Sequence, residues 1–146
     1  MFETISVIGG DLRQLTLARL LKAEGYHVFL YGFDNDETVL DGLQNENDRD
    51  YVLGADIIVL PVPVTFDGVT VNSPYSDKPL PIEELLDNMN SRAIVFGGQI
   101  KPNLQQAFEE RGILCRDYLK REELAVRNAV PTAFTVESLI LRIQKI

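Results

Sequence analysis

The apolar positions of this chain follow two spacings in turn, and this alternation predicts strands and helices one after another. Short apolar runs bounded by glycine or proline indicate strands. Longer segments with apolar residues three and four positions apart indicate helices. The predicted strands are Thr4 to Ile8, His27 to Tyr31, Ala55 to Pro61, Arg92 to Phe96 and Ile113 to Arg116. The predicted helices cover 12–24, 34–43, 81–89, 102–111, 120–126 and 136–146.

Strands that alternate with helices are typical of a parallel sheet covered on both faces. The pattern predicts a flavodoxin-like or Rossmann-like three-layer α/β sandwich, with a five-stranded parallel sheet ordered 2-1-3-4-5. At 146 residues, we expect a single domain over 1–146.

The segment 62–80, after the third strand, lacks helical spacing. Its Asp67-Gly68 pair predicts a tight hairpin. Long ordered loops in compact domains are often functional. Two interpretations stay open: a lid that includes Phe66, Tyr75 and Ser76, or a surface insertion with no role.

Composition narrows the class of protein. With 45% hydrophobic and 25% charged residues, the chain resembles an ordinary globular protein. Its formal charge of -8 argues against general affinity for nucleic acid or an anionic membrane, although local arginines still permit a small anionic ligand.

The cysteine count and the apolar runs bear on location. The single cysteine, Cys115, cannot form an internal disulfide and is interpreted as a buried strand residue rather than a nucleophile. The start of the chain has no signal-peptide pattern, and the longest apolar run, Ile57 to Val64, is too short to span a bilayer. We therefore expect a cytoplasmic protein without nucleic-acid or membrane partners. A homo-oligomer stays open.

Ligands of open α/β sheets bind outside the carboxyl ends of the strands, near the point where strand order reverses. The residues there follow the first, third and fourth predicted strands: Gly9, Gly10, Asp11 and Arg13, then Pro61 and Val62, then Gly97, Gly98 and Gln99. Arg13 is the strongest polar candidate, because its planar guanidinium fits a carboxylate and the adjacent helix start adds amide donors.

Each of these candidates also has a structural interpretation. Arg13 could form only an ion pair with Asp11 or Asp34. The glycines could serve only to let the chain turn.

Several familiar sites do not match this sequence. The dinucleotide fingerprint needs Gly-x-Gly-x-x-Gly, whereas Gly9 and Gly10 are adjacent and Arg13 stands where the third glycine should be. A phosphorylation receiver needs an acid at the end of the third strand, where this chain has Leu60-Pro61. The sequence has no phosphate-binding Gly-x-x-x-x-Gly-Lys and no histidine or cysteine cluster for a metal. We expect neither a cofactor nor a metal on this chain.

Several stretches together resemble the amino-terminal domain of the dipicolinate synthase A subunit, which is a spore-specific enzyme that oxidises a dihydrodipicolinate-type precursor. The first and last of them are the specific ones. They are Val7-Ile-Gly-Gly-Asp-Leu-Arg-Gln-Leu15, Tyr31-Gly-Phe-Asp34, Ile58-Val-Leu-Pro-Val62, Ile94-Val-Phe-Gly-Gly98 and Arg121-Glu-Glu-Leu-Ala-Val-Arg-Asn-Ala-Val-Pro-Thr132.

The resemblance implies a two-domain dehydrogenase whose first domain contacts a small dicarboxylate substrate, while a second, Rossmann domain binds NAD(P). It further implies dipicolinate synthesis during sporulation and a partnership with the dipicolinate synthase B subunit. In that arrangement residues of about 133–146 form a helix that leads into the second domain, and this chain alone is inactive. The chain is then either an excised domain or a stand-alone relative.

The resemblance also implies particular substrate-binding residues. Arg13, the Gly10 amide and Gly98 would form a carboxylate pocket, with Gly9, Asp11, Val62 and Gly97 beside it, and Asn128 and Thr132 belong to the last matching stretch. Members of the family place a Glu-Gly pair soon after Pro-Thr. Here Glu137 is either that acid displaced by a few residues, or the acid has no counterpart.

A second hypothesis, from another class, is a non-catalytic ligand-binding or subunit-interaction module of the same fold. On this hypothesis the segment 62–80 is a docking surface and the apolar stripe of the last predicted helix contacts a partner.

Overall fold

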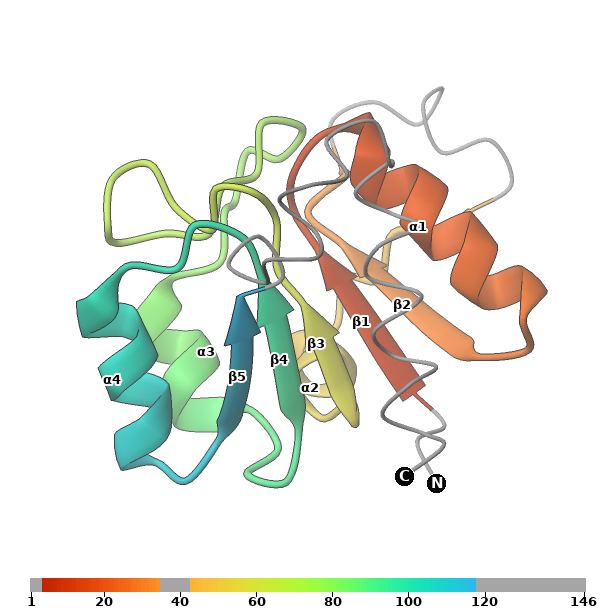
Figure 1. The fold of residues 1–146 in the computed structure, drawn as a ribbon. Helices are drawn as coiled ribbons and strands as arrows, with labels where there is room; N and C mark the ends of the chain where they lie inside the picture. Colours follow the sequence, from red (N-terminus) through yellow and green to blue (C-terminus); the bar gives the residue numbers. More distant parts are fainter. Residues whose placement is uncertain (1–3, 35–42, 118–146) are drawn as a thin grey trace, which may run out of the picture.

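Five parallel strands form the central sheet of the computed structural model, which describes residues 4–34 and 43–117 (Figure 1). Their order is β2-β1-β3-β4-β5, as the sequence pattern predicted. Register is continuous across the sheet, since Ile5 of β1 lies opposite Val28 on one side and Ile57 on the other. The strands are β1 (Thr4–Ile8), β2 (His27–Tyr31), β3 (Ile57–Val59), β4 (Ile94–Gly97) and β5 (Leu114–Asp117).

The described helices lie on both faces of the sheet, which gives the predicted three layers (Figure 1). Helix α1 (Leu12–Ala23) covers one face. The opposite face is covered by α2 (Arg49–Leu53), α3 (Ile82–Asn88) and α4 (Pro102–Glu110).

Alternation along the strands divides the core into two clusters. Ile5 and Val7 of β1 pack with Leu15 and Leu21 of α1, whereas Ile8 packs on the other face. Ser6 also points to that second face, where its hydroxyl donates to the Val52 carbonyl of α2 at 2.6 Å. Cys115 is buried in β5, as its sequence context predicted.

The sequence pattern missed helix α2, because five residues are too few to show helical spacing. Local chemistry explains why the helix forms: the Asp48 side chain caps it by accepting from the Asp50 amide at 2.9 Å, and Val52 and Leu53 are buried. The third strand is also shorter than predicted, spanning Ile57–Val59 rather than 55–61.

The predicted hairpin at Asp67-Gly68 is instead a turn organised by one side chain. The Asp67 carboxylate accepts from the Val69 and Thr70 amides, each at 2.8 Å, and from the hydroxyls of Thr65 and Thr70. These hydrogen bonds lower the pKa of Asp67 to about 2, with the Thr70 amide contributing most. The turn is thus fixed by a carboxylate rather than by paired strands.

Other predicted elements lie outside the described residues: most of the helix at 34–43, and the helices at 120–126 and 136–146. Within 4–34 and 43–117, no helix is long and apolar enough to cross a membrane.

Candidate functional site

The turn after β1 lies at the carboxyl edge of the sheet, next to β3, where strand order reverses. Gly9 has a φ of 64°, a left-handed conformation that favours glycine. A Cβ on Gly9 would lie 2.3 Å from the Asn72 carbonyl oxygen, so no larger residue fits without moving that backbone. The glycine is therefore required by the close approach of segment 62–80.

The Gly10 amide also bonds to segment 62–80, since it donates to the Asn72 carbonyl at 2.8 Å. Asn72 is held in turn by its own amide, which donates to the Val64 carbonyl, and by its side chain, which donates to the Pro63 carbonyl. The predicted carboxylate pocket used the Gly10 amide as a donor. In this structure a backbone carbonyl takes that place.

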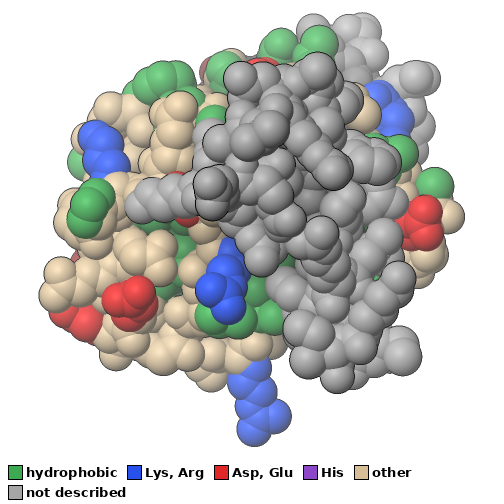
Figure 2. Space-filling view, in the orientation of Figure 1, with side chains coloured by type: hydrophobic (Ala, Val, Ile, Leu, Met, Phe, Trp, Pro, Cys, Tyr) green, Lys and Arg blue, Asp and Glu red, His purple; other side chains and the backbone are tan. Residues whose placement is uncertain are grey.

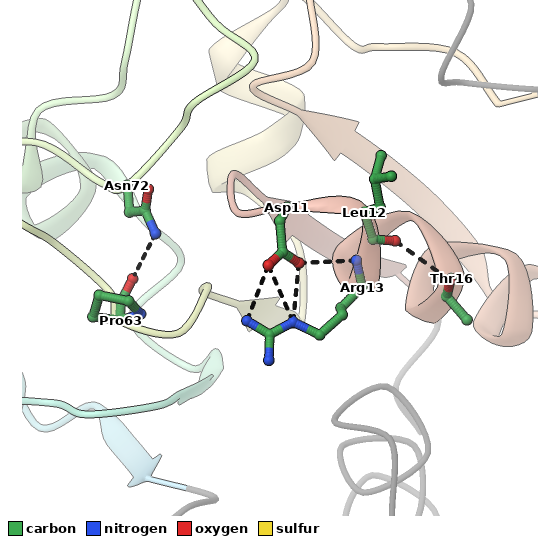
Figure 3. A network of polar contacts seen from close by, with 6 residues as sticks. All are labelled: Asp11, Leu12, Arg13, Thr16, Pro63 and Asn72. Atoms are coloured by element: carbon green, nitrogen blue, oxygen red, sulfur yellow. Dashed lines mark hydrogen bonds and ion pairs between the residues drawn. The ribbon is translucent and has the colours of Figure 1, made fainter.

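Asp11 and Arg13 begin α1 and stand beside this turn (Figure 3). The Asp11 carboxylate caps the helix by accepting from the Arg13 amide at 2.9 Å, and the Arg13 side chain contacts the same carboxylate through Nε at 3.0 Å and Nη2 at 3.0 Å. This side-chain hydrogen bond is the main reason that the pKa of Asp11 is lowered. Of the two ion pairs considered for Arg13, the structure shows the one with Asp11.

Both side chains of this pair remain within reach of a ligand. Their exposed fractions are 56% for Arg13 and 49% for Asp11, whereas Gly9 and Gly10 are buried. A guanidinium held in a fixed orientation can exchange or share its carboxylate partner with a ligand. Ligand binding by Arg13 stays a prediction.

Gly97, the last residue of β4, and the next residue, Gly98, are buried where the start of segment 62–80 approaches them. A Cβ on Gly98 would lie 2.4 Å from Val62 Cγ2, and the Gly98 amide points to the Pro61 carbonyl at 3.5 Å. Val62, another predicted site residue, thus covers Gly98 rather than facing an open cleft. The amide of Gly98, like that of Gly10, is not open to a ligand here.

The predicted lid residues do not behave as one unit. The Tyr75 ring stacks on the buried Phe33 ring with centroids 5.9 Å apart, and the Ser76 amide donates to the Ser73 carbonyl at 3.1 Å. Phe66, at the other end of the segment, is 77% exposed. Closure of these residues over a ligand stays a prediction.

A small cavity that sequence reasoning missed lies beside β4, between segment 64–68 and helices α3 and α4. Its volume is about 190 Å³, and its wall combines apolar side chains with the polar Thr65 and Asn103 and the exposed Gln99 and Lys101. The sequence predicted Gln99 as a site residue, because it follows the Gly97-Gly98 turn. It did not predict Lys101, because an isolated lysine before a helix is common. The lining residues are Val64, Thr65, Gly68, Ile82, Leu86, Gln99, Lys101, Asn103, Leu104 and Ala107.

Gln14 is a second residue that the sequence did not predict, and its side chain contacts the strand ends on both sides of the Gly9 turn. It is buried on α1, and its side-chain amide points to the carbonyls of Ile8 and Val59 at 3.3 and 3.5 Å. It therefore links the carboxyl ends of β1 and β3 at the point where their order reverses.

Three predicted site residues, Asn128, Thr132 and Glu137, lie outside the described residues. Among the residues that are described, no group of three or more His, Cys, Asp or Glu side chains could hold a metal ion. On the described part of the face in Figure 2, acidic and basic side chains are scattered rather than gathered into a basic patch.

Comparison with known protein families gives a direct match. The family model for the N-terminal domain of the dipicolinate synthase A subunit matches residues 4–119. The dipicolinate synthase A subunit of Bacillus subtilis (strain 168) is 28% identical over 130 residues, which cover 88% of this chain and 44% of that protein. The chain thus spans about half the length of this relative.

Solved structures of the same family also resemble this chain. The crystal structure of the A chain of Bacillus subtilis dipicolinate synthase superposes with a TM-score of 0.74 at 26% identity, covering 99% of this chain and 48% of that one. D-lactate dehydrogenase with NAD⁺ from Lactobacillus jensenii shares the fold at 22% identity and a TM-score of 0.54, covering 90% of this chain and 41% of that one.

Proposed function

The chain belongs to the family of N-terminal domains of the dipicolinate synthase A subunit, and from this premise we propose that it binds the dicarboxylate substrate of such a synthase. The match over residues 4–119 carries the proposal. It includes the turn after β1 and the turn after β4, where ligands of open α/β sheets bind.

Arg13 is the side chain that we assign to a substrate carboxylate. It stands at the carboxyl edge, it is half exposed, and Asp11 holds it in a fixed orientation at the start of α1. A planar guanidinium can bind a carboxylate through two parallel hydrogen bonds. Because both Gly10 and Gly98 amides point to backbone carbonyls, this assignment rests on Arg13 rather than on those amides.

The oxidation itself would use groups outside this domain. We propose that NAD(P), held by a second domain, would accept the hydride that the ring of a dihydrodipicolinate-type precursor loses together with a proton to solvent, and that this oxidation yields dipicolinate in the cytoplasm during sporulation. The dipicolinate synthase B subunit is the proposed partner. A D-lactate dehydrogenase solved with NAD⁺ shares the fold of this domain.

Isothermal titration calorimetry of the chain with dipicolinate tests the proposal. We expect saturable binding that Arg13→Ala weakens by roughly ten- to hundredfold, because a charge-assisted hydrogen bond is worth about 1.5–3 kcal/mol. Arg111→Ala is the matched control, since Arg111 also forms an exposed ion pair, with Asp87, but it follows the end of α4 just before β5 starts, at the opposite edge of the sheet from this turn. Equal affinity of the two variants would remove Arg13 from the site.

One observation favours the alternative, a subunit-interaction module. Phe66 and Val69 flank the Asp67 turn and are 77% and 64% exposed. Because Asp67 fixes this turn, two apolar side chains are held out to solvent. If Phe66→Ala abolishes association with the remainder of a dipicolinate synthase while dipicolinate fails to bind at all, this alternative replaces the first.

A further inference from the structure

A shallow cavity of about 460 Å³, widely open to solvent, lies at the amino end of the sheet, away from the Gly9 turn. It is lined by Thr4, His27, Phe29, Glu46 and Tyr51. Thr4 and His27 begin β1 and β2, which run parallel, so this cavity and the carboxyl edge lie at opposite ends of the strands. The proposed dicarboxylate site does not use it.

Aromatic rings form the wall of this cavity. The His27 and Phe29 rings meet edge to face with centroids 4.8 Å apart, and Phe29 stacks on Tyr51 with centroids 6.1 Å apart. Tyr51 is 60% exposed and His27 is also exposed. The faces of aromatic rings are negative, and they attract cations that reach them.

Glu46 adds a carboxylate at a fixed position in the same cavity. Its backbone amide donates to the Leu30 carbonyl at 2.6 Å, which ties it to the outer edge of β2, and its Oε2 accepts from the Asp48 amide at 3.1 Å. The side chain is half-buried and forms no ion pair with any described residue. It therefore presents a charge that a ligand cation could neutralise.

Glu46 is the one carboxylate among the five residues that line the cavity. Arg49 is turned away, since its side chain donates to the Tyr31 hydroxyl and to Glu84. Lys22 lines a neighbouring cavity that shares His27, Phe29 and Glu46 with this one, but among the described residues it forms no ion pair with Glu46. None of the five lining residues is a lysine or an arginine.

We propose that this cavity binds the guanidinium of an arginine side chain presented by a partner protein. A guanidinium can stack flat on the rings and also donate to Glu46, whereas a lysine ammonium lacks the planar face. Exposed aromatic side chains that surround a central pocket are typical anchors of protein interfaces. The carboxylate of Glu46 and the aromatic rings therefore favour a planar cation as the partner's contacting group.

The test is an NMR titration of the ¹⁵N-labelled chain with the peptide acetyl-Gly-Arg-Gly-amide at pH 7.5. We expect saturable shifts at the amides of His27, Phe29, Glu46 and Tyr51. The same peptide with citrulline, which keeps the shape but lacks the charge, should bind about tenfold more weakly. The lysine peptide should also bind more weakly than the arginine peptide.

Single substitutions distinguish binding in the cavity from general attraction of the peptide to an acidic protein. Glu46→Gln keeps an acceptor for the Asp48 amide but removes the charge, and it should weaken arginine binding about tenfold. Tyr51→Ala should weaken it as well, and Tyr51→Phe should restore it. Asp50→Asn removes an acid of α2 outside the cavity and should change affinity less than about twofold.

Three outcomes would overturn the proposal: no saturable shift with the arginine peptide, equal binding of the citrulline or lysine peptide, or an equal loss in Asp50→Asn and Glu46→Gln. Folding of each variant is read from its own spectrum, and dipicolinate affinity provides an independent control.

Discussion

The carboxylate of Asp11 performs two tasks for Arg13: it accepts from the Arg13 backbone amide at 2.9 Å and holds the Arg13 guanidinium through Nε and Nη2. One acid therefore caps helix α1 and orients the proposed carboxylate-binding side chain (Figure 3). It also competes with any ligand carboxylate for the same donors.

This competition predicts the effect of Asp11→Asn. Asparagine caps a helix about as well as aspartate, so α1 should keep its start. Because an exposed ion pair is worth about 0–1 kcal/mol, its removal should strengthen dipicolinate binding by up to about fivefold. Calorimetry measures this, with Asp87→Asn, which breaks the exposed pair with Arg111, as the control. Weaker binding by Asp11→Asn would show that orientation matters more than competition.

The turn at Asp67 predicts a response to acid. The pKa of Asp67 is lowered to about 2 in the folded chain, below its ordinary value of 3.8. Its stabilising contribution is therefore complete above about pH 4 and is lost as the pH falls through about 2. Amide resonances of Val69 and Thr70 should titrate with a midpoint near 2.

Asp67→Ala provides the matching stability measurement. The variant should be less stable than the wild type at pH 7, and the difference should shrink as the pH is lowered toward 2. A midpoint of about 4 at Val69 and Thr70, the ordinary value for an aspartate, or a stability difference that does not depend on pH, would mean that the carboxylate does not fix this turn.

Close packing at Gly9 predicts a difference between two glycine substitutions. Gly25 has a φ of 99° with open space at its Cβ position, so Gly25→Ala should cost about 1 kcal/mol from backbone strain alone. Gly9→Ala adds a clash with the Asn72 carbonyl and should cost about 1–3 kcal/mol more. Urea unfolding measures both. Equal costs would mean that segment 62–80 yields readily.

A hydrogen bond between two elements predicts the cost of Tyr31→Phe. The Tyr31 hydroxyl accepts from Arg49 Nε at 2.6 Å, and the Arg49 guanidinium carbon lies 5.7 Å from the Tyr31 ring centroid. Removal of the hydroxyl should destabilise the chain by about 1–2 kcal/mol. Tyr51→Phe, at an exposed ring, should change stability by less than about 0.5 kcal/mol. Similar losses of stability in Tyr31→Phe and Tyr51→Phe would show that the hydrogen bond from Arg49 does not stabilise the contact between β2 and α2.

The alternation of apolar runs predicted the sheet, because each strand shows its burial in its own residues, and the strand order followed from the fold class that this alternation indicates. Helix α2 was missed because its stability comes from a cap at Asp48 and from tertiary burial of Val52 and Leu53. Similarly, the bond from the Gly10 amide to the Asn72 carbonyl has no sequence signal, since any residue supplies a carbonyl. The sequence predicted Arg13 as a candidate, but only the structure shows that its guanidinium forms an ion pair with Asp11 rather than with Asp34, both of which are described residues.

The most direct test of the central claim is an NMR titration of the ¹⁵N-labelled chain with dipicolinate. If Arg13 binds a substrate carboxylate, saturable shifts should appear at the amides of Leu12, Arg13 and Gln14 and around Gly98, and Arg13→Ala should need roughly ten- to hundredfold more dipicolinate to reach half-saturation. Saturable shifts elsewhere, or shifts near Arg13 that half-saturate at the same dipicolinate concentration in Arg13→Ala, would contradict the account.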